Sequence, residues 1–482
     1  MSHPHRRSMP KETIMEFWSS NYWSVLNQIA FLALVLLLAN IIRRKIGFLR
    51  RSLLPTAVFA GFMMLLIKEL NILPTGFFQV SLMEMITFHT LAIGFIALAL
   101  KSLSSQKKTS KMVAVDSGLV IVNTYVMQAT IGLIITITLA LTLFPQLISG
   151  AGMLLPMGFG QGPGPAGNMG NVYETNMVNP FAGGKAFGLS IASLGFIWAC
   201  VLGVAYLNYL VKKRKLEVKA DGTVQTEVTT AVVEEADEIP LSEAIDKFTV
   251  QICLVLLVYF VTYLFMKGFD WVILTGAFGD FGTESMRPLI WGFNFIWATL
   301  FALLFKRLFA KLRDWHIMQR RYPNDYMLNR IAGTAFDFMI IASIAAINIA
   351  DLQQLWIPFL ILTTAGGILT FIYIRFICKR VYPDYELEAT ISMFGMLTGT
   401  ASTGIALLRE IDPHFQTPAA NNLVLGASSA IAFGFPLLML VGIAYRSDTL
   451  ALITLGITAV AFIVINVILL RRQIFKKKTV QV

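Results

Sequence analysis

A glycine-rich stretch in the first half of the chain has the composition of a binding loop. Residues 158–171 read GFGQGPGPAGNMGN and carry six glycines and two prolines between two long apolar runs. We do not expect such a backbone inside a helix, and it cannot lie bare against lipid, where its amides would lack partners. Irregular backbone at membrane depth survives where protein or water satisfies it, and such places commonly bind ions or solutes. The alternative is a loop in water outside the bilayer.

A second stretch occupies the corresponding place in the second half. Residues 395–409 read GMLTGTASTGIALLR and are rich in small and hydroxyl side chains, so that we expect little helix there as well. Two such stretches at equivalent positions favour the interpretation that both enter the membrane.

The composition identifies an integral membrane protein. Of the 482 residues, 56% are hydrophobic and 14% are charged, and the mean hydropathy is +0.68; no soluble domain hides so much apolar surface. The net charge of +11 does not indicate nucleic acid binding, because the Lys and Arg residues cluster at the ends of apolar segments. Cys200, Cys253 and Cys378 lie within or beside apolar segments, which excludes a disulfide scaffold and a Cys-based zinc site.

Apolar runs divide the chain into two similar halves. The predicted spans of the first half are 23–42, 53–70, 85–100, 113–144 and 187–210, and those of the second are 248–266, 288–305, 331–350, 355–377 and 422–445, with an extra run at 450–470. Segment 85–100 is short and contains His89 and Thr90, which predicts a broken helix. Because five is an odd number, the two halves enter the membrane in opposite orientations, as in an inverted repeat.

The charge distribution supports this topology. Most of the 39 Lys and Arg residues fall in the segments placed inside, so we expect the N-terminus outside and the C-terminus in the cytoplasm of a plasma-membrane protein. We therefore predict an all-α integral membrane protein with two inverted repeats of five transmembrane helices, each with a reentrant hairpin, plus one extra C-terminal helix. The predicted parts are an outer tail (1–22), a first repeat (23–213) with a reentrant loop at 148–171, a cytoplasmic linker (214–247), a second repeat (248–445) with a loop at 387–410, and an extra helix with a basic tail (446–482).

Local similarity between the halves agrees with a repeat. Residues 88–97, FHTLAIGFIA, and 336–345, FDFMIIASIA, share four identities, and both lie in the third span of their half. Each carries an ionisable residue, His89 or Asp337, beside a phenylalanine.

At the two small-residue stretches the sequence resembles the bacterial sodium:glutamate symporter family. Residues 159–166, FGQGPGPA, resemble the family's glycine motif, and residues 398–406, TGTASTGIA, resemble its second motif. The matching positions are Gly160, Gly162, Gly164 and Ala166 in the first and Gly399, Thr403, Ile405 and Ala406 in the second. The resemblance covers about residues 23–445. The sequence departs from the motifs at Leu397 and Ala401, where glycine is expected, and at Pro163 and Pro165.

Hairpins of this kind offer two complementary chemistries. The free amides at the start of a half-helix carry partial positive charge toward an anion, and unwound carbonyls with hydroxyl or amide oxygens suit sodium. We expect these residues to bind substrate: Gly160, Gly162, Gly164, Asn168, Gly399, Thr400, Ser402, Thr403 and Arg409. The predicted sodium ligands are Asp337, Thr400 and Asn171.

Two of these residues carry a charge and have alternative readings. Asp337 lies within an apolar span. Placing a carboxylate at the centre of a membrane helix costs about 3 kcal/mol unless polar groups surround it, so we expect Asp337 to be a sodium ligand or proton carrier. The guanidinium of Arg409 could pair with a substrate carboxylate. The alternative is that Arg409 forms a surface charge cluster with Glu410 and Asp412.

The resemblance implies a sodium-coupled symporter of glutamate or a related anionic solute that works by alternating access, with the lipid bilayer around it, no cofactor besides the coupling ion and the possibility of a homodimer. A carrier of another organic acid such as citrate, coupled to sodium or protons, and an ion channel are the alternatives. No HExxH, GxSxG or Walker lysine motif is present, so we do not expect an enzyme or an ATP-driven pump.

Overall fold

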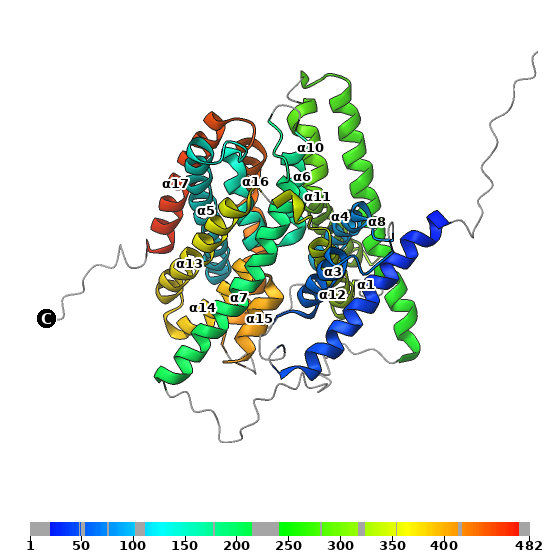
Figure 1. The fold of residues 1–482 in the computed structure, drawn as a ribbon. Coiled ribbons are helices and arrows are strands. Elements are labelled where there is room, and N and C mark those ends of the chain that lie inside the picture. Colours follow the sequence, from blue (N-terminus) through cyan, green and yellow to red (C-terminus); the bar gives the residue numbers. More distant parts are fainter. Residues whose placement is uncertain are drawn as a thin grey trace, which may run out of the picture.

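A computed structural model describes residues 20–47, 49, 54–74, 77–101, 111–176, 179–214, 241–279, 282–316, 323–352, 354–412 and 417–471. Within these ranges every regular element is a helix (Figure 1). Eight of the described helices are long and apolar enough to cross a membrane. Residues 1–19 of the predicted N-terminal tail, residues 215–240 of the predicted linker and residues 472–482 of the basic C-terminal tail lie outside the described residues.

The first half contains α1 (Ser20–Lys45), α3 (Thr56–Glu69), α4 (Val80–Leu100), α5 (Lys111–Thr142), η1 (Ser149–Met153), η2 (Pro156–Gln161), α6 (Pro163–Glu174) and α7 (Gly184–Arg214). The second half contains α8 (Leu241–Leu274), η3 (Gly282–Met286), α10 (Arg287–Gly292), α11 (Asn294–Asp314), α12 (Asp325–Ala345), η4 (Ala350–Leu352), α13 (Trp356–Val381), η5 (Pro383–Tyr385), α14 (Glu386–Thr398), α15 (Ala401–Arg409), α16 (Ala419–Ala444) and α17 (Asp448–Leu469). Each of the eleven predicted spans therefore contains a helix.

Three local predictions were wrong. The helix α4 runs unbroken over 21 residues, and the polar side chain of Thr90 is satisfied without a break, since its hydroxyl donates to the carbonyl of Ile86 in the same helix. The two small-residue stretches are mostly helical. In the first stretch, Pro163 stands in the first turn of α6, where the missing N–H would have no partner within the helix. In the second stretch only Gly399 and Thr400 separate two helices.

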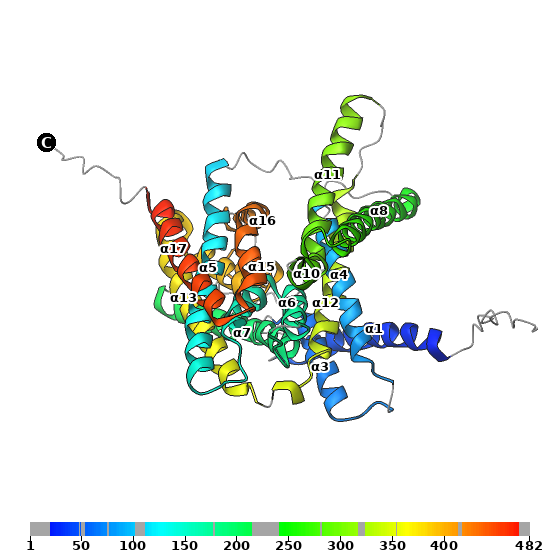
Figure 2. The ribbon, with the colours of Figure 1, turned by 90° about the horizontal axis from the view of Figure 1, so that it is seen from above.

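The helices form two groups that lie side by side (Figures 1 and 2). One group, here called the scaffold, contains α1, α3, α4, α8, α10, α11 and α12. The other, called the core, contains α5, η1, η2, α6, α7 and α13 to α17. Each half of the chain gives its first three predicted spans to the scaffold and its remaining elements to the core, so that both halves contribute to both groups.

Matched hydrogen bonds relate the two halves within the scaffold. The side-chain oxygen of Gln28 in α1 accepts a bond of 3.0 Å from the backbone N–H of Gln79, which caps α4. The side-chain oxygen of Gln251 in α8 accepts a bond of the same length from the backbone N–H of Asn324, which caps α12. Both glutamines are buried.

Two lysines repeat this correspondence at the other ends of the same helices. The Lys68 ammonium in α3 donates to the carbonyl of Ile347, beyond the end of α12, and the Lys306 ammonium in α11 donates to the carbonyl of Lys101 at the end of α4. A cation at a helix C-terminus opposes the negative end of the helix dipole. The scaffold thus carries the same contact twice, once from each half.

The face of the molecule where α4, α7, α13 and α17 end is here called the basic face, because α13 has Lys379 and Arg380 in its last turn and Lys101 and Arg471 lie just beyond α4 and α17. At this face Arg471, beyond α17, makes an ion pair of 2.8 Å with Asp116 at the start of α5. Tyr382, beyond α13, donates a hydrogen bond of 2.8 Å to Ser117. The other end is called the opposite face, and there Ser149 at the start of η1 donates a bond of 2.6 Å to Asp448 at the start of α17.

Candidate functional site

The first small-residue stretch forms a hairpin that starts and ends at the opposite face. The segment from Ser149 to Gln161 runs from the opposite face into the molecule along α5. After Gly162 the chain turns, and α6 runs back to the opposite face beside α7. At its start, a Cβ built on Gly150 would lie 2.5 Å from the carbonyl oxygen of Ala444. At its end, a Cβ built on Gly170 would lie 2.4 Å from that of Gly184. We call residues 149–174 hairpin 1.

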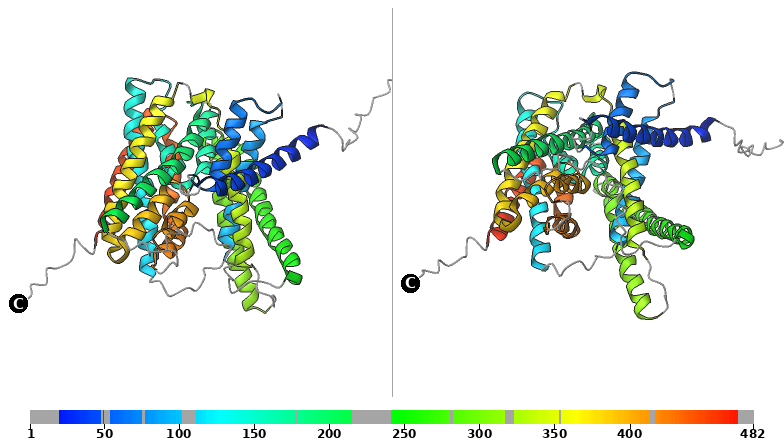
Figure 3. Two further views of the ribbon diagram at one scale, coloured as in Figure 1. Left: turned by 60° about the horizontal axis from the view of Figure 1, so that its bottom comes forward. Right: turned by 90° about the horizontal axis from the view of Figure 1, so that it is seen from below.

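The second stretch forms a hairpin that starts and ends at the basic face. Helices α14 and α15 lie against each other, and a Cβ on Gly395 would come within 2.9 Å of the Gly404 backbone. Leu407 in α15 packs on Gly203, toward the basic end of α7. We call residues 386–409 hairpin 2. Figure 3 shows α14 and α15 beside this end of α7.

The two hairpins meet tip to tip halfway along α7. A Cβ built on Gly195 would lie 2.3 Å from the carbonyl oxygen of Thr398 in hairpin 2 and 2.9 Å from the Phe159 ring in hairpin 1. A Cβ built on Gly162 would have the Thr400 methyl carbon as its nearest neighbour, at 3.9 Å. The two breaks, at Gly162 and at Gly399 and Thr400, therefore face each other at the same level of the core.

Gly162 and Thr400 have the conformations that turn the chain at these tips. Gly162 has φ +90° and ψ −173°, a region that side-chain-bearing residues rarely adopt. Thr400 is extended and caps α15, and its hydroxyl accepts from the N–H of Thr403 and lies 3.2 Å from the Thr403 hydroxyl. The tip of hairpin 2 thus brings the C-terminal carbonyls of α14 beside the N-terminal amides of α15.

The other predicted glycines make room for protein. A Cβ on Gly160 would lie 2.2 Å from the Tyr125 ring, and one on Gly164 would lie 2.7 Å from Leu91 of the scaffold. A Cβ on Gly399 would meet the Gly395 carbonyl at 3.0 Å. Of the four glycines predicted to bind substrate, Gly162 alone would bring an added Cβ no closer to a neighbour than ordinary van der Waals contact.

A buried amide in α5 lies against the tip of hairpin 2. Gln128 is fully buried, and its Nε2 donates to the carbonyl oxygen of Leu397 (2.9 Å) and to Oγ1 of Thr370 (3.1 Å). Its Oε1 has no hydrogen-bond partner among the described residues. Nearby, Tyr125 donates a bond of 3.0 Å to the carbonyl of Gly160. Neither Gln128 nor Tyr125 was predicted as a site residue, although a polar glutamine within an apolar span is typical of a functional position.

The remaining predicted residues are spread over the molecule. Asn168 in α6 donates through Nδ2 to the carbonyl of Gly292 in α10 (3.1 Å), so it joins core to scaffold. Asn171 is exposed and lies nine residues beyond Gly162, which is about 13 Å along a helix, so it does not share an ion site with Thr400. The backbones of Ser402 and Arg409 belong to α15, and their side chains lie outside what the structure describes.

Asp337 lies on an exposed strip near the middle of α12. Gly333 and Thr334, one turn earlier, are also exposed, and a Cβ on Gly333 would meet no atom within 4 Å. Within the described part of the chain Asp337 has no hydrogen-bond or ion-pair partner, whereas Met339, two residues later, packs beside Gly164 of hairpin 1. Among the described residues no hydrogen bond or ion pair joins Asp337 to Thr400 or Asn171, which belong to the two hairpins.

At the base of hairpin 2 a tyrosine fixes the entry of the chain. Tyr385 accepts a hydrogen bond of 2.6 Å from Nδ2 of Asn422 in α16. Partial burial raises the pKa of the Tyr385 phenol, so the side chain stays neutral.

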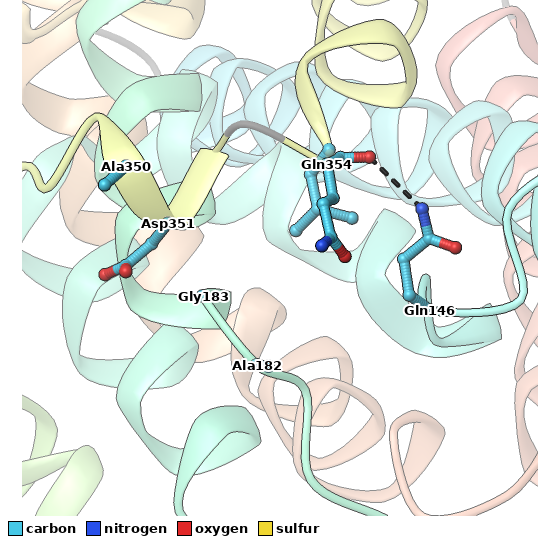
Figure 4. Close-up of a pocket in the computed structure, with 7 residues that line it drawn as sticks. Gln146, Ala182, Gly183, Ala350, Asp351 and Gln354 are labelled. Carbon is cyan, nitrogen blue, oxygen red and sulfur yellow. Dashed lines mark hydrogen bonds between the residues drawn. The ribbon is translucent and has the colours of Figure 1, made fainter.

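A separate cavity of about 270 Å³ opens at the opposite face (Figure 4). It lies where η4, the connection from scaffold helix α12 to core helix α13, crosses the start of α7, and Gln146 donates there to the carbonyl of Gln354 (3.2 Å). Its one charged lining residue is Asp351, which does not suit an anionic ligand. The lining residues are Gln146, Ala182, Gly183, Ala350, Asp351, Gln354 and Leu355.

Apolar helices of spanning length, together with two broken helices whose breaks meet at Gly162 and Thr400, are typical of a multi-pass membrane protein. The sequence model of the sodium/glutamate symporter family matches residues 22–417, and the chain belongs to that family. It is thus a sodium-coupled membrane transporter rather than a member of an enzyme class, and the family predicted from the two motifs is confirmed. A comparison with curated proteins finds no matching sequence.

Proposed function

We propose that this protein couples sodium entry to the symport of glutamate, or of a closely related anionic amino acid or dicarboxylate, by alternating access of the elevator type. The observation that carries the proposal is the meeting of the two hairpin tips at Gly162 and Thr400. A helix start and a helix end lie there side by side, so that one small volume offers both an anion site and a cation site.

The substrate carboxylate docks at the start of α15. Residues 401–403 all have backbone N–H groups, whereas the first turn of α6 contains Pro163 and Pro165, which have none. Hairpin 2 therefore supplies more amide donors than hairpin 1, and Thr400 and Thr403 add hydroxyls. Gly162 lets the backbone of hairpin 1 approach the bound solute.

Sodium binds at the end of α14. Its ligands are neutral oxygens, with the Leu397 carbonyl and Oε1 of Gln128 as the principal candidates and the Thr370 hydroxyl beside them. Rotation of the Gln128 amide would replace its N–H donors by the oxygen that now lacks a partner. A hard cation at the negative end of a helix is electrostatically favoured.

Asp337 lies on the route by which sodium enters and does not bind sodium between the two hairpin tips. A carboxylate that faced lipid at this depth would cost about 3 kcal/mol, so the exposed strip of α12 lines an aqueous route between scaffold and core. Replacing Asp337 by Asn is expected to reduce sodium-driven uptake about tenfold while glutamate binding at saturating sodium persists. Flux and equilibrium binding measured on the same preparation would check this; unchanged flux with unchanged sodium dependence would contradict the role.

The transport cycle uses the internal repeat. The matched bonds of Gln28 and Gln251, and of Lys68 and Lys306, support an inverted repeat in which hairpins 1 and 2 are equivalent reentrant elements from opposite leaflets. In this proposal the basic face is cytoplasmic, the N-terminus lies outside, and the core moves against the scaffold. The homodimer that the resemblance implies stays a prediction.

Reconstituted protein tests the function directly. Liposomes loaded with potassium and placed in sodium should accumulate labelled glutamate above the outside concentration, whereas liposomes without a sodium gradient should only equilibrate. Accumulation against a gradient also separates a carrier from a channel. The proposal fails if no acidic amino acid or dicarboxylate accumulates in response to sodium.

A further inference from the structure

The core touches the scaffold unequally at its two faces. Hairpin 1 packs on the scaffold through α6, which contacts α4, α10 and α12, and Gly292 of α10 fits against Met169 and Val172. The principal contacts of the α15 helix of hairpin 2 are with α14, α7 and α16, all of which belong to the core. The described arrangement is thus closed along hairpin 1, toward the opposite face.

An ion pair joins the two groups at this closed side. The Lys185 ammonium at the start of α7 lies 2.6 Å from a carboxylate oxygen of Glu84 in α4. The two side chains are 21% and 30% exposed, so the pair is partly shielded from water and is stronger than a fully solvated one. The backbone N–H of Lys185 also donates to the Glu174 carboxylate (3.0 Å), which fixes α7 to the end of hairpin 1.

Among its described residues, the second half of the chain shows no equivalent pair between α12 and α16. In the register set by Gln79 and Asn324, the counterpart of Glu84 is Asn329, whose amide oxygen accepts from Lys101 within the scaffold. Lys185 is the second residue of α7, and the second residue of the corresponding helix α16 is Ala420. The attraction therefore stabilises closure at one face only.

We infer that Glu84 and Lys185 form a one-sided latch that holds the core against the scaffold at the opposite face and opens once in each transport cycle. The inference rests on the proposed alternating-access function, since a latch has a role only if the two groups separate.

A labelling experiment tests the latch without using transport. Val172, buried beneath the closed side, is replaced by Cys in a Cys253→Ser background that removes the exposed native thiol. Adding Glu84→Gln should increase the rate of labelling by a water-soluble maleimide about fivefold. The matched control Glu69→Gln removes a carboxylate that pairs with Lys68 inside the scaffold and should leave the rate unchanged. Equal rates in the Glu84→Gln variant and the control would overturn the latch.

A cross-link tests whether the latch must open. In the Cys253→Ser background, the double variant Glu84→Cys, Lys185→Cys is treated with a bifunctional maleimide or with N-ethylmaleimide, which modifies the same thiols without joining them. Cross-linked protein should lose sodium-driven uptake and the singly modified protein should keep it; uptake by fully cross-linked protein at the rate of the control would refute the inference. If the unmodified protein accumulates no glutamate, the proposed function fails while the labelling comparison still decides the latch.

Discussion

Replacing Gly162 by Val is expected to abolish sodium-driven glutamate uptake, with at least about a tenfold loss. A β-branched residue at φ +90° costs about 1–3 kcal/mol in backbone strain, and its methyl groups would enter the space toward Thr400. The tip of hairpin 1 must then move away from hairpin 2, and the substrate volume between them changes shape. Initial uptake rates under a fixed sodium gradient measure the effect.

The control for this variant is Gly268→Ala in α8, where an added Cβ meets no atom within 4 Å. That variant should transport at the wild-type rate. Gly162→Val should still be recovered as folded protein from detergent extracts, because the strain is small beside the apolar area buried in the core. Near-normal uptake by folded Gly162→Val would show that the tip geometry is unimportant.

Replacing Gln128 by Leu is expected to weaken sodium activation of transport about tenfold or more. The change removes the unpaired Oε1 and also leaves the Leu397 carbonyl and the Thr370 hydroxyl without their donor. Higher sodium should restore part of the uptake if Gln128 is a ligand, because mass action offsets a weakened site. The measurement is uptake as a function of sodium concentration at saturating glutamate.

Asn123→Leu separates ion binding from general destabilisation. Asn123 is a second fully buried amide of α5, with its own unpaired oxygen, and it donates to Tyr373 (2.6 Å), away from the tips. Its loss should also lower the free energy of unfolding, by about 1 kcal/mol, because Tyr373 loses one hydrogen bond but still donates to Asn466 (3.2 Å). If both variants show the same sodium curve, Gln128 has only a structural role.

The order of helices could be predicted from sequence, because spanning helices must be apolar over a fixed length whatever they pack against. Local backbone conformation could not. Glycine and proline weaken a helix in water, but in hairpin 1 the closely packed α7 leaves room only for glycine at residues 158, 167 and 170, and helical geometry is compatible with that contact.

The internal sequence comparison pairs α4 with α12, as the matched hydrogen bonds of Gln28 and Gln251 do, but in a different register. The similarity of 88–97 and 336–345 pairs Phe88 with Phe336. However, Phe88 lies nine residues after the cap of α4 at Gln79, and Phe336 lies twelve after the cap of α12 at Asn324. Apolar helices draw on few residue types, so chance identities in sequence can differ from the register of the matched buried hydrogen bonds.

The positions of the two helix breaks were predictable from the sequence, whereas the residues that other helices bring beside them were not. Gly162 and Thr400 could be found because a break in a membrane segment leaves a mark in composition. Gln128 and Gly195 come from α5 and α7, and only the folded arrangement brings them to the hairpins. Asn171 was assigned by nearness in sequence, and the rise of α6 separates it from the tip.

The most direct test is the unfolding temperature of the purified protein with and without glutamate, in sodium and in potassium. Glutamate at about 100 times its dissociation constant should stabilise the protein by about 2.7 kcal/mol in sodium and hardly at all in potassium. The shift should be lost in Thr400→Val, because this change removes the hydroxyl that caps α15 at the tip of hairpin 2. It should be kept in Gly268→Ala. A glutamate shift of equal size in potassium, or one that survives in Thr400→Val, would contradict a joint sodium and carboxylate site between the hairpins.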